Sequence, residues 1–204
     1  MNFPISSDDA ARWLTSRLNG KLPTSIIGDV PWRTPSALTR PAAVLIPLVW
    51  HAESPSVLLT KRTMGLRHHA GQISFPGGKI DLSDGGAVDA ALREAEEEVG
   101  IARERVRVLG RLPHYTTITD YRVEPVVGMI VPPYQTILQP SEVALVFEVP
   151  LDLVLNTNNY ARHTYEKDGV QGSYLALDYQ DHHIWGATAA ILYIFAAALS
   201  GVGA

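Results

Sequence analysis

The chain of 204 residues contains no cysteine, which excludes disulfide bonds, thiolate metal sites and a cysteine nucleophile. It also lacks a strong excess of either charge, because 17 Lys and Arg residues stand against 21 Asp and Glu residues, with a formal net charge of −4. This balance provides no basic surface of the kind typical of general nucleic-acid binding. We therefore expect no nucleic-acid partner.

Hydrophobic runs long enough for membrane insertion are also missing. The N-terminus, MNFPISSDDAARW, has no basic region followed by an apolar core, so it does not have the pattern of a secretory signal. The most apolar segment, residues 184–199, falls short of the ~20 residues that a helix needs to cross a bilayer and has no flanking basic anchor. We expect a cytoplasmic protein without membrane contact, in which residues 184–200 form a buried helix packed on a sheet.

The composition that is present, 46% hydrophobic residues, suits one compact α/β domain spanning residues 1–204. Its first 40 residues predict a helix from Ser6 or Ser7 to about Leu18, followed by a proline-containing extended loop. Apolar runs between turn signals predict buried strands, and a pair of turn formers, Asp168 and Gly169, predicts a hairpin. The predicted strands are residues 42–50, 57–62, 106–112, 121–131 and 143–149, and the hairpin strands are residues 160–165 and 172–177.

Residues 77–101, GGKIDLSDGGAVDAALREAEEEVGI, predict a glycine-rich turn that leads into a helix. Glu94, Glu97 and Glu98 stand at i, i+3 and i+4, so their carboxylates share one face. Each like-charged pair at this spacing costs about 0.2–0.5 kcal/mol, and a hard divalent cation such as Mg²⁺ would offset that cost. A solvated acidic helix end is the ordinary alternative, but acidic residues at a helix C-terminus oppose the helix dipole.

The other residues of this helix support two further predictions, one for its core-facing side and one for its acidic side. We expect an apolar stripe to pack on the core, formed by Val88, Leu92, Ala95 and Val99. Small side chains on the acidic face, one turn earlier, would leave room for a ligand: Ala87, Ala90 and Ala91.

The same segment resembles the Nudix box, in which Gly, five residues, Glu and seven residues precede Arg-Glu-apolar-x-Glu-Glu-x-Gly-apolar. The first half departs from that pattern because, counted from Gly78, the acidic position is Asp84, and eight residues separate it from Arg93. The role of Asp84 therefore stays open. The second half matches at Arg93, Glu94, Ala95, Glu97, Glu98, Gly100 and Ile101.

The resemblance implies a Nudix-type α/β/α sandwich with a mixed central sheet and a catalytic loop-helix-loop at residues 77–101. It also implies a pyrophosphatase whose metal ligands are Glu94, Glu97 and Glu98. Arg93, one turn before Glu97, is expected to orient that carboxylate. A further glutamate outside the box is expected to bind metal or activate water, and Glu142 is the candidate, with Glu124 as the alternative.

Residues 58–78, LLTKRTMGLRHHAGQISFPGG, resemble a narrower signature, that of the Nudix branch that cleaves coenzyme A. Thr63 departs from it, since the signature has Ser or Ala there. This resemblance implies Mg²⁺- or Mn²⁺-dependent hydrolysis of coenzyme A to 3′-phosphoadenosine 5′-phosphate and 4′-phosphopantetheine. The matching residues are Leu58, Leu59, Thr60, Arg62, Arg67, Gly71, Phe75, Pro76, Gly77 and Gly78.

Within that segment we expect Arg62 and Arg67 to bind substrate phosphates, since a guanidinium can hold two phosphate oxygens at once. An ion pair between Arg62 and a structural acid is an equal alternative. Gly77 and Gly78 complete the expected substrate-binding residues. Another substrate, such as NADH, ADP-ribose or a dinucleoside polyphosphate, stays open, as do a non-hydrolytic nucleotide-binding module and the choice between monomer and homodimer.

Overall fold

The computed structural model of the protein describes residues 3–4, 6–19, 39–52, 54–66, 69–167 and 169–200. Its central sheet has eight strands with the main order β3-β2-β1-β7-β5, while β4 pairs with β1, β6 with β7 and β8 with β2. The pair β1–β7 is parallel and the other pairs are antiparallel, so the sheet is mixed as expected. The strands are β1 (Arg40–Val49), β2 (Ser56–Arg62), β3 (Ile73–Ser74), β4 (Gly77–Lys79), β5 (Val106–Arg111), β6 (Tyr115–Thr116), β7 (Tyr121–Ile130) and β8 (Val143–Pro150).

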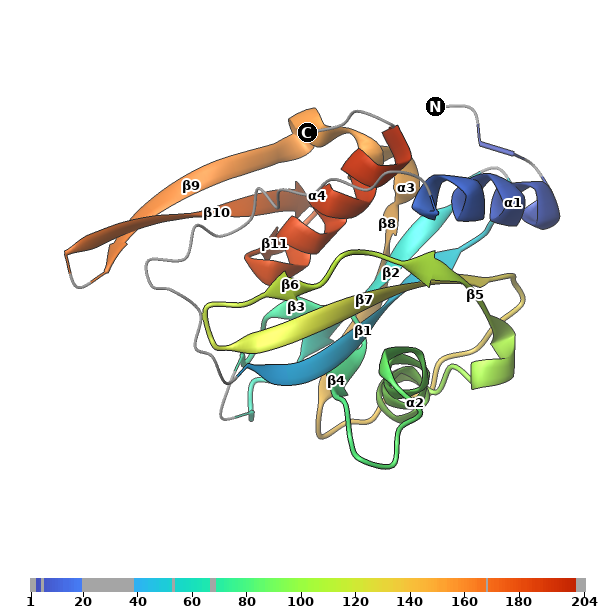
Figure 1. Ribbon diagram of the computed structural model, residues 1–204, viewed down its shortest axis with the longest axis horizontal. Coiled ribbons are helices and arrows are strands. Elements are labelled where there is room, and N and C mark those ends of the chain that lie inside the picture. Colours follow the sequence, from blue (N-terminus) through green and yellow to red (C-terminus); the bar gives the residue numbers. More distant parts are fainter. Residues whose placement is uncertain are drawn as a thin grey trace.

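Helices cover both faces of this sheet (Figure 1). In β1, Ala43, Leu45 and Val49 belong to a hydrophobic cluster with helix α2 (Ala87–Val99). The alternate residues of β1 face a larger cluster that contains the buried sides of α1 (Ser7–Leu18), α3 (Leu151–Leu155) and α4 (Ala187–Ser200). The side-chain period of two along each strand thus produces the predicted α/β/α layers.

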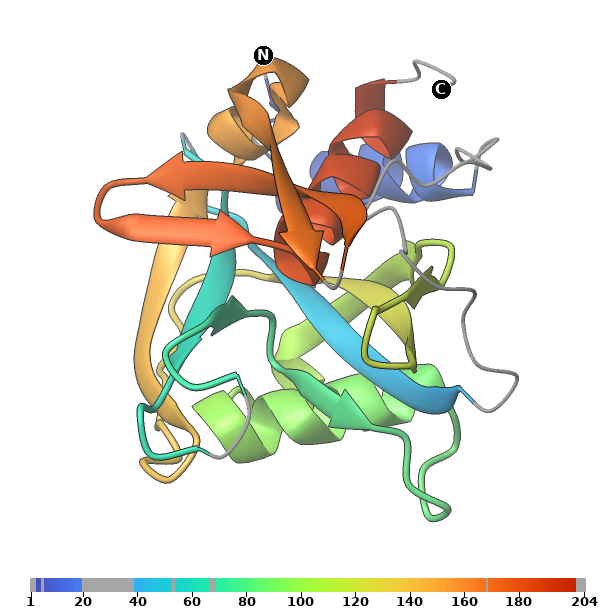
Figure 2. The same ribbon diagram turned by 90° about the vertical axis from the view of Figure 1, so that its left-hand side faces the viewer.

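A second, smaller sheet has the order β11-β10-β9 and packs beside α4, as Figures 1 and 2 show. Strands β9 (Tyr160–Lys167) and β10 (Val170–Tyr179) form the predicted hairpin, and β11 (His182–Trp185) pairs with β10. Leu175, Leu177 and Ile184 are buried in the cluster that contains α4. Two single 3₁₀ turns, η1 (Arg103–Arg105) and η2 (Thr157–Asn159), connect elements of the chain.

The expected helix at residues 184–200 begins later than predicted. Trp185 is the last residue of β11 and pairs with Ala176, so the chain is still part of a sheet at this point. Gly186 then turns with a φ of 63°, and α4 starts at Ala187. The buried helix is present, but its predicted start was wrong because hydrophobic content alone does not distinguish a buried strand from a buried helix. Within the described ranges, no helix is long and apolar enough to span a membrane.

Candidate active site

Helix α2 packs on β1 through alanines, whose small side chains form most of its buried side: Ala87, Ala90, Ala91 and Ala95. The expectation that the first three would leave room for a ligand is wrong, because their methyl groups lie in the core. Val88 and Leu92, expected in the core, are only partly buried beside the same cluster. On the glutamate face of the helix, formed by Glu94, Glu97 and Glu98, the side chains of Glu94 and Glu98 lie against β4.

Strand β4 meets that glutamate face through two glycines. The backbone N–H of Gly77 donates a hydrogen bond of 3.1 Å to Oε2 of Glu98. A Cβ added to Gly78 would lie 2.4 Å from Oε1 of Glu94, so the carboxylate occupies the space that a side chain would need. The two glycines thus hold carboxylates in place, while substrate binding by Gly77 and Gly78 stays a prediction.

Glu98 is almost fully buried, with 3% of its surface exposed. Burial raises its pKa to about 7, and repulsion from Glu94 and Glu142 adds to the effect, whereas Gly77 N–H and Arg62 act in the opposite direction. Nη1 of Arg62 lies 3.6 Å from Oε1 of Glu98, beyond hydrogen-bond distance. Arg62 therefore pairs with an acid, and that acid is one of the predicted metal ligands.

Glu142 lies beside the same carboxylates, although it is distant from them in sequence. Its backbone carbonyl accepts a 2.9 Å hydrogen bond from Thr63 N, directly after β2 ends at Arg62. Its charge raises the pKa of both Glu94 and Glu98, after the larger effect of burial. The pairing of β2 with β8 thus brings the predicted outside glutamate to the end of the helix that carries the others.

Arg93 connects the helix to the preceding loop. Its Nε and Nη2 donate hydrogen bonds of 2.9 and 3.0 Å to the two carboxylate oxygens of Asp84, whose side chain is 3% exposed. Its Nη1 donates to Oε1 of Glu94 at 3.0 Å and to Oε2 of Glu97 at 3.1 Å. The contact lowers the pKa of Asp84, so the carboxylate that departs from the Nudix spacing is the ionised partner that clamps Arg93.

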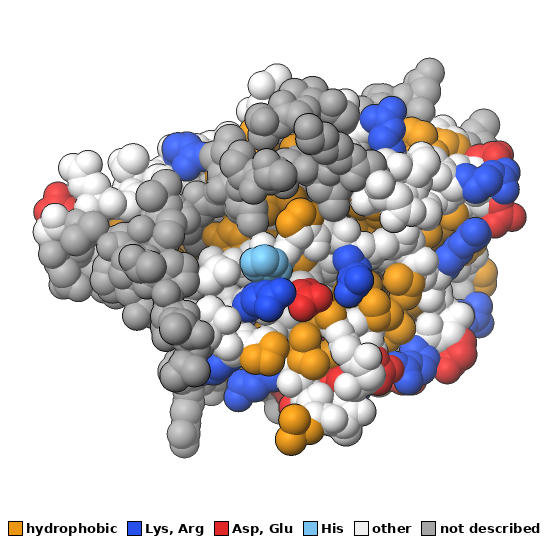
Figure 3. Space-filling model, in the orientation of Figure 1, with side chains coloured by type: hydrophobic (Ala, Val, Ile, Leu, Met, Phe, Trp, Pro, Cys, Tyr) orange, Lys and Arg blue, Asp and Glu red, His pale blue; other side chains and the backbone are white. Residues whose placement is uncertain are grey.

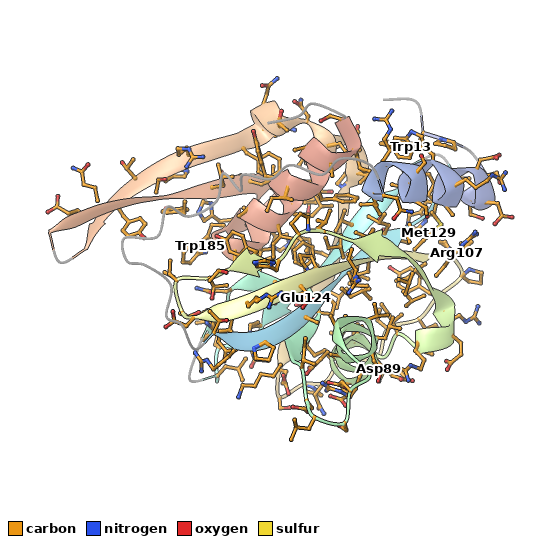
Figure 4. All side chains as sticks on the ribbon, in the orientation of Figure 1. Trp13, Asp89, Arg107, Glu124, Met129 and Trp185 are labelled. Atoms are coloured by element: carbon orange, nitrogen blue, oxygen red, sulfur yellow. The ribbon has the colours of Figure 1, made fainter. Side chains whose placement is uncertain are left out.

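Glu124, the alternative outside glutamate, projects from β7 (Figure 4). Its Oε2 lies 3.8 Å from Nη1 of Arg111 in an ion pair. It is thus paired with a cation on the neighbouring strand, and its role as the outside glutamate stays a prediction, as does that of Glu142. Arg67, the second predicted phosphate ligand, lies outside the described residues.

The donor set at this end of the sheet suits a hard divalent cation. Among the described residues, no three carboxylate or imidazole groups converge into a ready-made metal site, and an arginine lies beside each of the three helix glutamates. Burial and the neighbouring charges of Glu97 and Glu142 nevertheless raise the pKa of Glu94 despite its bond to Arg93. More carboxylates than guanidinium groups lie at this site, so negative charge is in excess, and oxygen ligands of this kind are those that Mg²⁺ prefers.

The space-filling view shows a different charge arrangement elsewhere on the surface. On the face in Figure 3, the Lys and Arg side chains of the described residues lie singly or beside acidic side chains, without a continuous basic patch. Charges of one sign are thus concentrated at the glutamate cluster and not on this face.

Comparison with known proteins agrees with this geometry. A family model described as the NUDIX domain matches residues 39–166, which include β1, the Arg93 clamp and all four glutamates. The chain belongs to the Nudix family. It is therefore a hydrolase that acts on a nucleoside diphosphate derivative, and enzymes of this family generally use divalent metal ions.

Individual Nudix relatives are similar over most of the chain. A protein named uncharacterized Nudix hydrolase NudL from Escherichia coli (strain K12) is 44% identical over 153 residues, 75% of this chain and 79% of the relative. Its namesake from Photorhabdus laumondii subsp. laumondii is 43% identical over 154 residues, 76% of this chain and 82% of the relative. A solved Nudix hydrolase from M. smegmatis, RenU, is 24% identical, with 57% of this chain and 73% of that chain covered and a TM-score of 0.49.

Proposed function

We propose that this Nudix hydrolase cleaves the diphosphate bond of coenzyme A or its derivatives, releasing 3′-phosphoadenosine 5′-phosphate and 4′-phosphopantetheine. The hydrolytic part of the proposal depends on one observation: buried Glu98 lies 3.6 Å from Arg62 at the end of β2, close enough to Glu94 and Glu142 for their charges to raise its pKa. The choice of coenzyme A is supported by the signature in residues 58–78, which contains Arg62, Gly77 and Gly78.

Glu94, Glu97 and Glu98 are the residues proposed to hold Mg²⁺ or Mn²⁺. When bound, such an ion withdraws charge from the phosphate oxygens and makes water more acidic. Glu97 is the most exposed of the three, with 59% of its side chain accessible, whereas the side chain of Glu98 is 4% exposed. Glu98 therefore supplies the fixed side of the site and Glu97 the adaptable side, with Arg93 limiting the orientations of the Glu97 carboxylate.

Glu142 is the residue proposed to take the proton of the attacking water. Glu94 and Glu97 are each bound to Arg93, and Glu98 accepts the Gly77 N–H. Within the described residues, by contrast, no hydrogen bond or ion pair engages the Glu142 carboxylate. A carboxylate with unoccupied acceptor positions can receive a proton without first breaking an existing bond.

Arg62 is proposed to bind a substrate phosphate. Its Nη1 lies 3.6 Å from Glu98, so the guanidinium donors are not consumed by a direct hydrogen bond there. Its Nε is buried and has no hydrogen-bond partner within the described part of the chain. A guanidinium with spare donors beside a carboxylate cluster can bind phosphate oxygens that would otherwise be repelled.

Mass spectrometry of products formed in ¹⁸O-labelled water tests this proposal. We expect coenzyme A and Mg²⁺ to give the two named products, with a single ¹⁸O that identifies the phosphorus attacked. If NADH, ADP-ribose or a dinucleoside polyphosphate were hydrolysed with higher catalytic efficiency than coenzyme A, that compound would be the preferred substrate instead. Nucleotide binding without any product, with metal and with chelator alike, would instead indicate a non-hydrolytic module.

A second experiment addresses the 3′-phosphate that marks coenzyme A. If Arg67 binds that phosphate, Arg67→Ala raises KM for coenzyme A but not for 3′-dephospho-coenzyme A. Lys61→Ala is the matched control, because it removes a neighbouring positive charge without changing either candidate arginine. An unchanged ratio of the two KM values in Arg67→Ala would remove Arg67 from the 3′-phosphate site.

A further inference from the structure

Strand β9 is the outer strand of the smaller sheet. The described strands of that sheet have the order β11-β10-β9, so β10 pairs with one edge of β9 and no described strand pairs with the other. The strand is eight residues long, contains neither proline nor glycine, and has a regular register with β10 from Tyr160 to Lys167. Figure 1 shows the β9–β10 hairpin extending away from the central sheet. A regular edge strand of this length is a template for pairing with another strand.

The hairpin register determines which residues of β9 can make such a pairing. In an antiparallel pair, hydrogen-bonded and non-hydrogen-bonded residues alternate, and a two-residue loop is flanked by a hydrogen-bonded pair, here Lys167 and Val170. The odd-numbered residues of β9 therefore bond to β10. Their even-numbered neighbours direct the backbone N–H and C=O groups to the outer edge, and these include Arg162, Thr164 and Glu166.

The charges on that outer edge are complementary to themselves. Arg162, Thr164 and Glu166 are all exposed, and Nη1 of Arg162 donates a 2.9 Å hydrogen bond to Ser173 Oγ on β10. Arg162 and Glu166 carry opposite charges at equal distances along the strand from Thr164. When two copies of the strand pair antiparallel about Thr164, Arg162 of each copy stands opposite Glu166 of the other. Pairings centred on Arg162 or on Glu166 would instead set like charges opposite one another, which is unfavourable.

The opposite face of the smaller sheet supports the same register. The rings of Trp185 and Tyr174 have centroids 5.5 Å apart, and those of Tyr174 and His163 are 5.3 Å apart and stacked. This aromatic row crosses all three strands and reaches β9, and Figure 4 shows Trp185 at its β11 end. In the pairing centred on Thr164, Tyr165 of the second copy stands opposite His163, so the row continues into the second sheet.

We infer that two copies of this chain associate through β9, in an antiparallel two-fold pairing centred on Thr164, to form a continuous six-stranded sheet. The interface is isologous, because each copy contributes the same strand and the same two charges. It does not depend on the proposed substrate or on the metal.

Charge reversal in the 204-residue chain tests the register. We expect the wild type to sediment as a dimer at micromolar concentrations, and Arg162→Glu or Glu166→Arg to weaken the dimer by at least about tenfold, since each places like charges opposite one another. The double variant, which exchanges the two charges, should dimerise again. An equimolar mixture of the two single variants should form a heterodimer, because the two acidic side chains of one variant then face the two basic side chains of the other.

Each other outcome overturns the inference. A monomeric wild type in this concentration range contradicts it, as does a dimer that tolerates both single reversals. Single variants that are folded by near-ultraviolet circular dichroism but do not associate when mixed would also contradict it. Arg105→Glu, a reversal at an exposed residue of η1, is the matched control and should leave the dimer unchanged.

A cross-link gives an independent measurement, because the chain has no cysteine of its own. In the proposed register the two Thr164 residues form the central pair, with Cα atoms about 5.5 Å apart, within the range that a disulfide spans. Mild oxidation should therefore link Thr164→Cys into a covalent dimer, whereas Arg105→Cys should stay monomeric on a denaturing gel. Equal cross-linking of the two variants would show random collision and overturn the register.

Discussion

Two side-chain clusters, one around buried Glu98 and one around partly buried Glu148, lie at opposite ends of the paired strands β2 and β8, and they differ in how the charge is balanced. At one end, Glu98 and Glu142 lie near Arg62, and burial together with mutual repulsion raises the pKa of Glu98. At the other end, Glu148 accepts a 2.8 Å hydrogen bond from Nε2 of His51, and further hydrogen bonds from Ser56 and Tyr134.

The pKa shifts show what this difference means. Burial opposes ionisation of Glu148, but the bonds from Ser56, Tyr134 and His51 outweigh it and lower its pKa. Glu98 is ionised at a free-energy cost, whereas ionised Glu148 is stabilised by its neighbours. We infer that the first cluster gives up stability to keep charge available for a cation, and that the second cluster stabilises the fold.

The variant with the largest expected effect, Glu98→Gln, removes a charge from the first cluster. Glu98→Gln keeps an acceptor for the Gly77 N–H but removes the charge, so we expect kcat for coenzyme A to fall by at least ~10²-fold. The melting temperature should stay near or above that of the wild type, because a costly buried charge is gone. Glu96→Gln, an exposed change on the same helix, is the control and should keep wild-type kcat.

A change beside the cluster tests how it is organised. Asp84→Asn removes the charge that clamps Arg93, so Glu94 and Glu97 lose a fixed partner. We expect the apparent affinity for Mg²⁺ to weaken by about 10–100-fold, the usual effect of losing a residue that orients metal ligands. Titration of activity against Mg²⁺ measures this, and an unchanged Mg²⁺ dependence would limit Asp84 to a role in loop stability.

The second cluster should respond in the opposite way. Glu148→Gln weakens three hydrogen bonds, and we expect the free energy of unfolding to fall by about 1–3 kcal/mol. The activity per folded molecule should stay at the wild-type level, because Glu148 lies at the far end of β8. Urea denaturation and kcat measured on the same preparation test the comparison, and a large loss of kcat would contradict the division of roles.

The smallest effect is a pH dependence of stability. The pKa of Glu148 is lowered in the folded state, so its stabilising contribution is present above the unfolded carboxyl pKa of about 4.3 and is lost as pH falls through the folded value. The wild type should therefore lose more stability than Glu148→Gln between neutral pH and the acidic range. Parallel stability curves for the two proteins would show that Glu148 does not contribute this dependence.

Local patterns were enough for much of this protein. Spacing placed Glu94, Glu97 and Glu98 on one side of a helix, and apolar runs between turn signals placed β1, β2, β7 and β8 close to their observed limits. The Nudix family followed from short motifs, because a catalytic helix needs its residue types at set intervals. These features depend on neighbours along the chain, whose geometry the backbone determines.

What only the tertiary structure decided depends on contacts between distant residues. The alanines of α2 pack inward because the sheet lies close to them. The last helix begins after Trp185 because the preceding residues pair with β10 as strand β11. Asp84 reaches Arg93 despite its unusual spacing, since the loop before α2 folds back. Burial, pairing and charge balance arise where segments meet, and no pattern within a single segment contains that information.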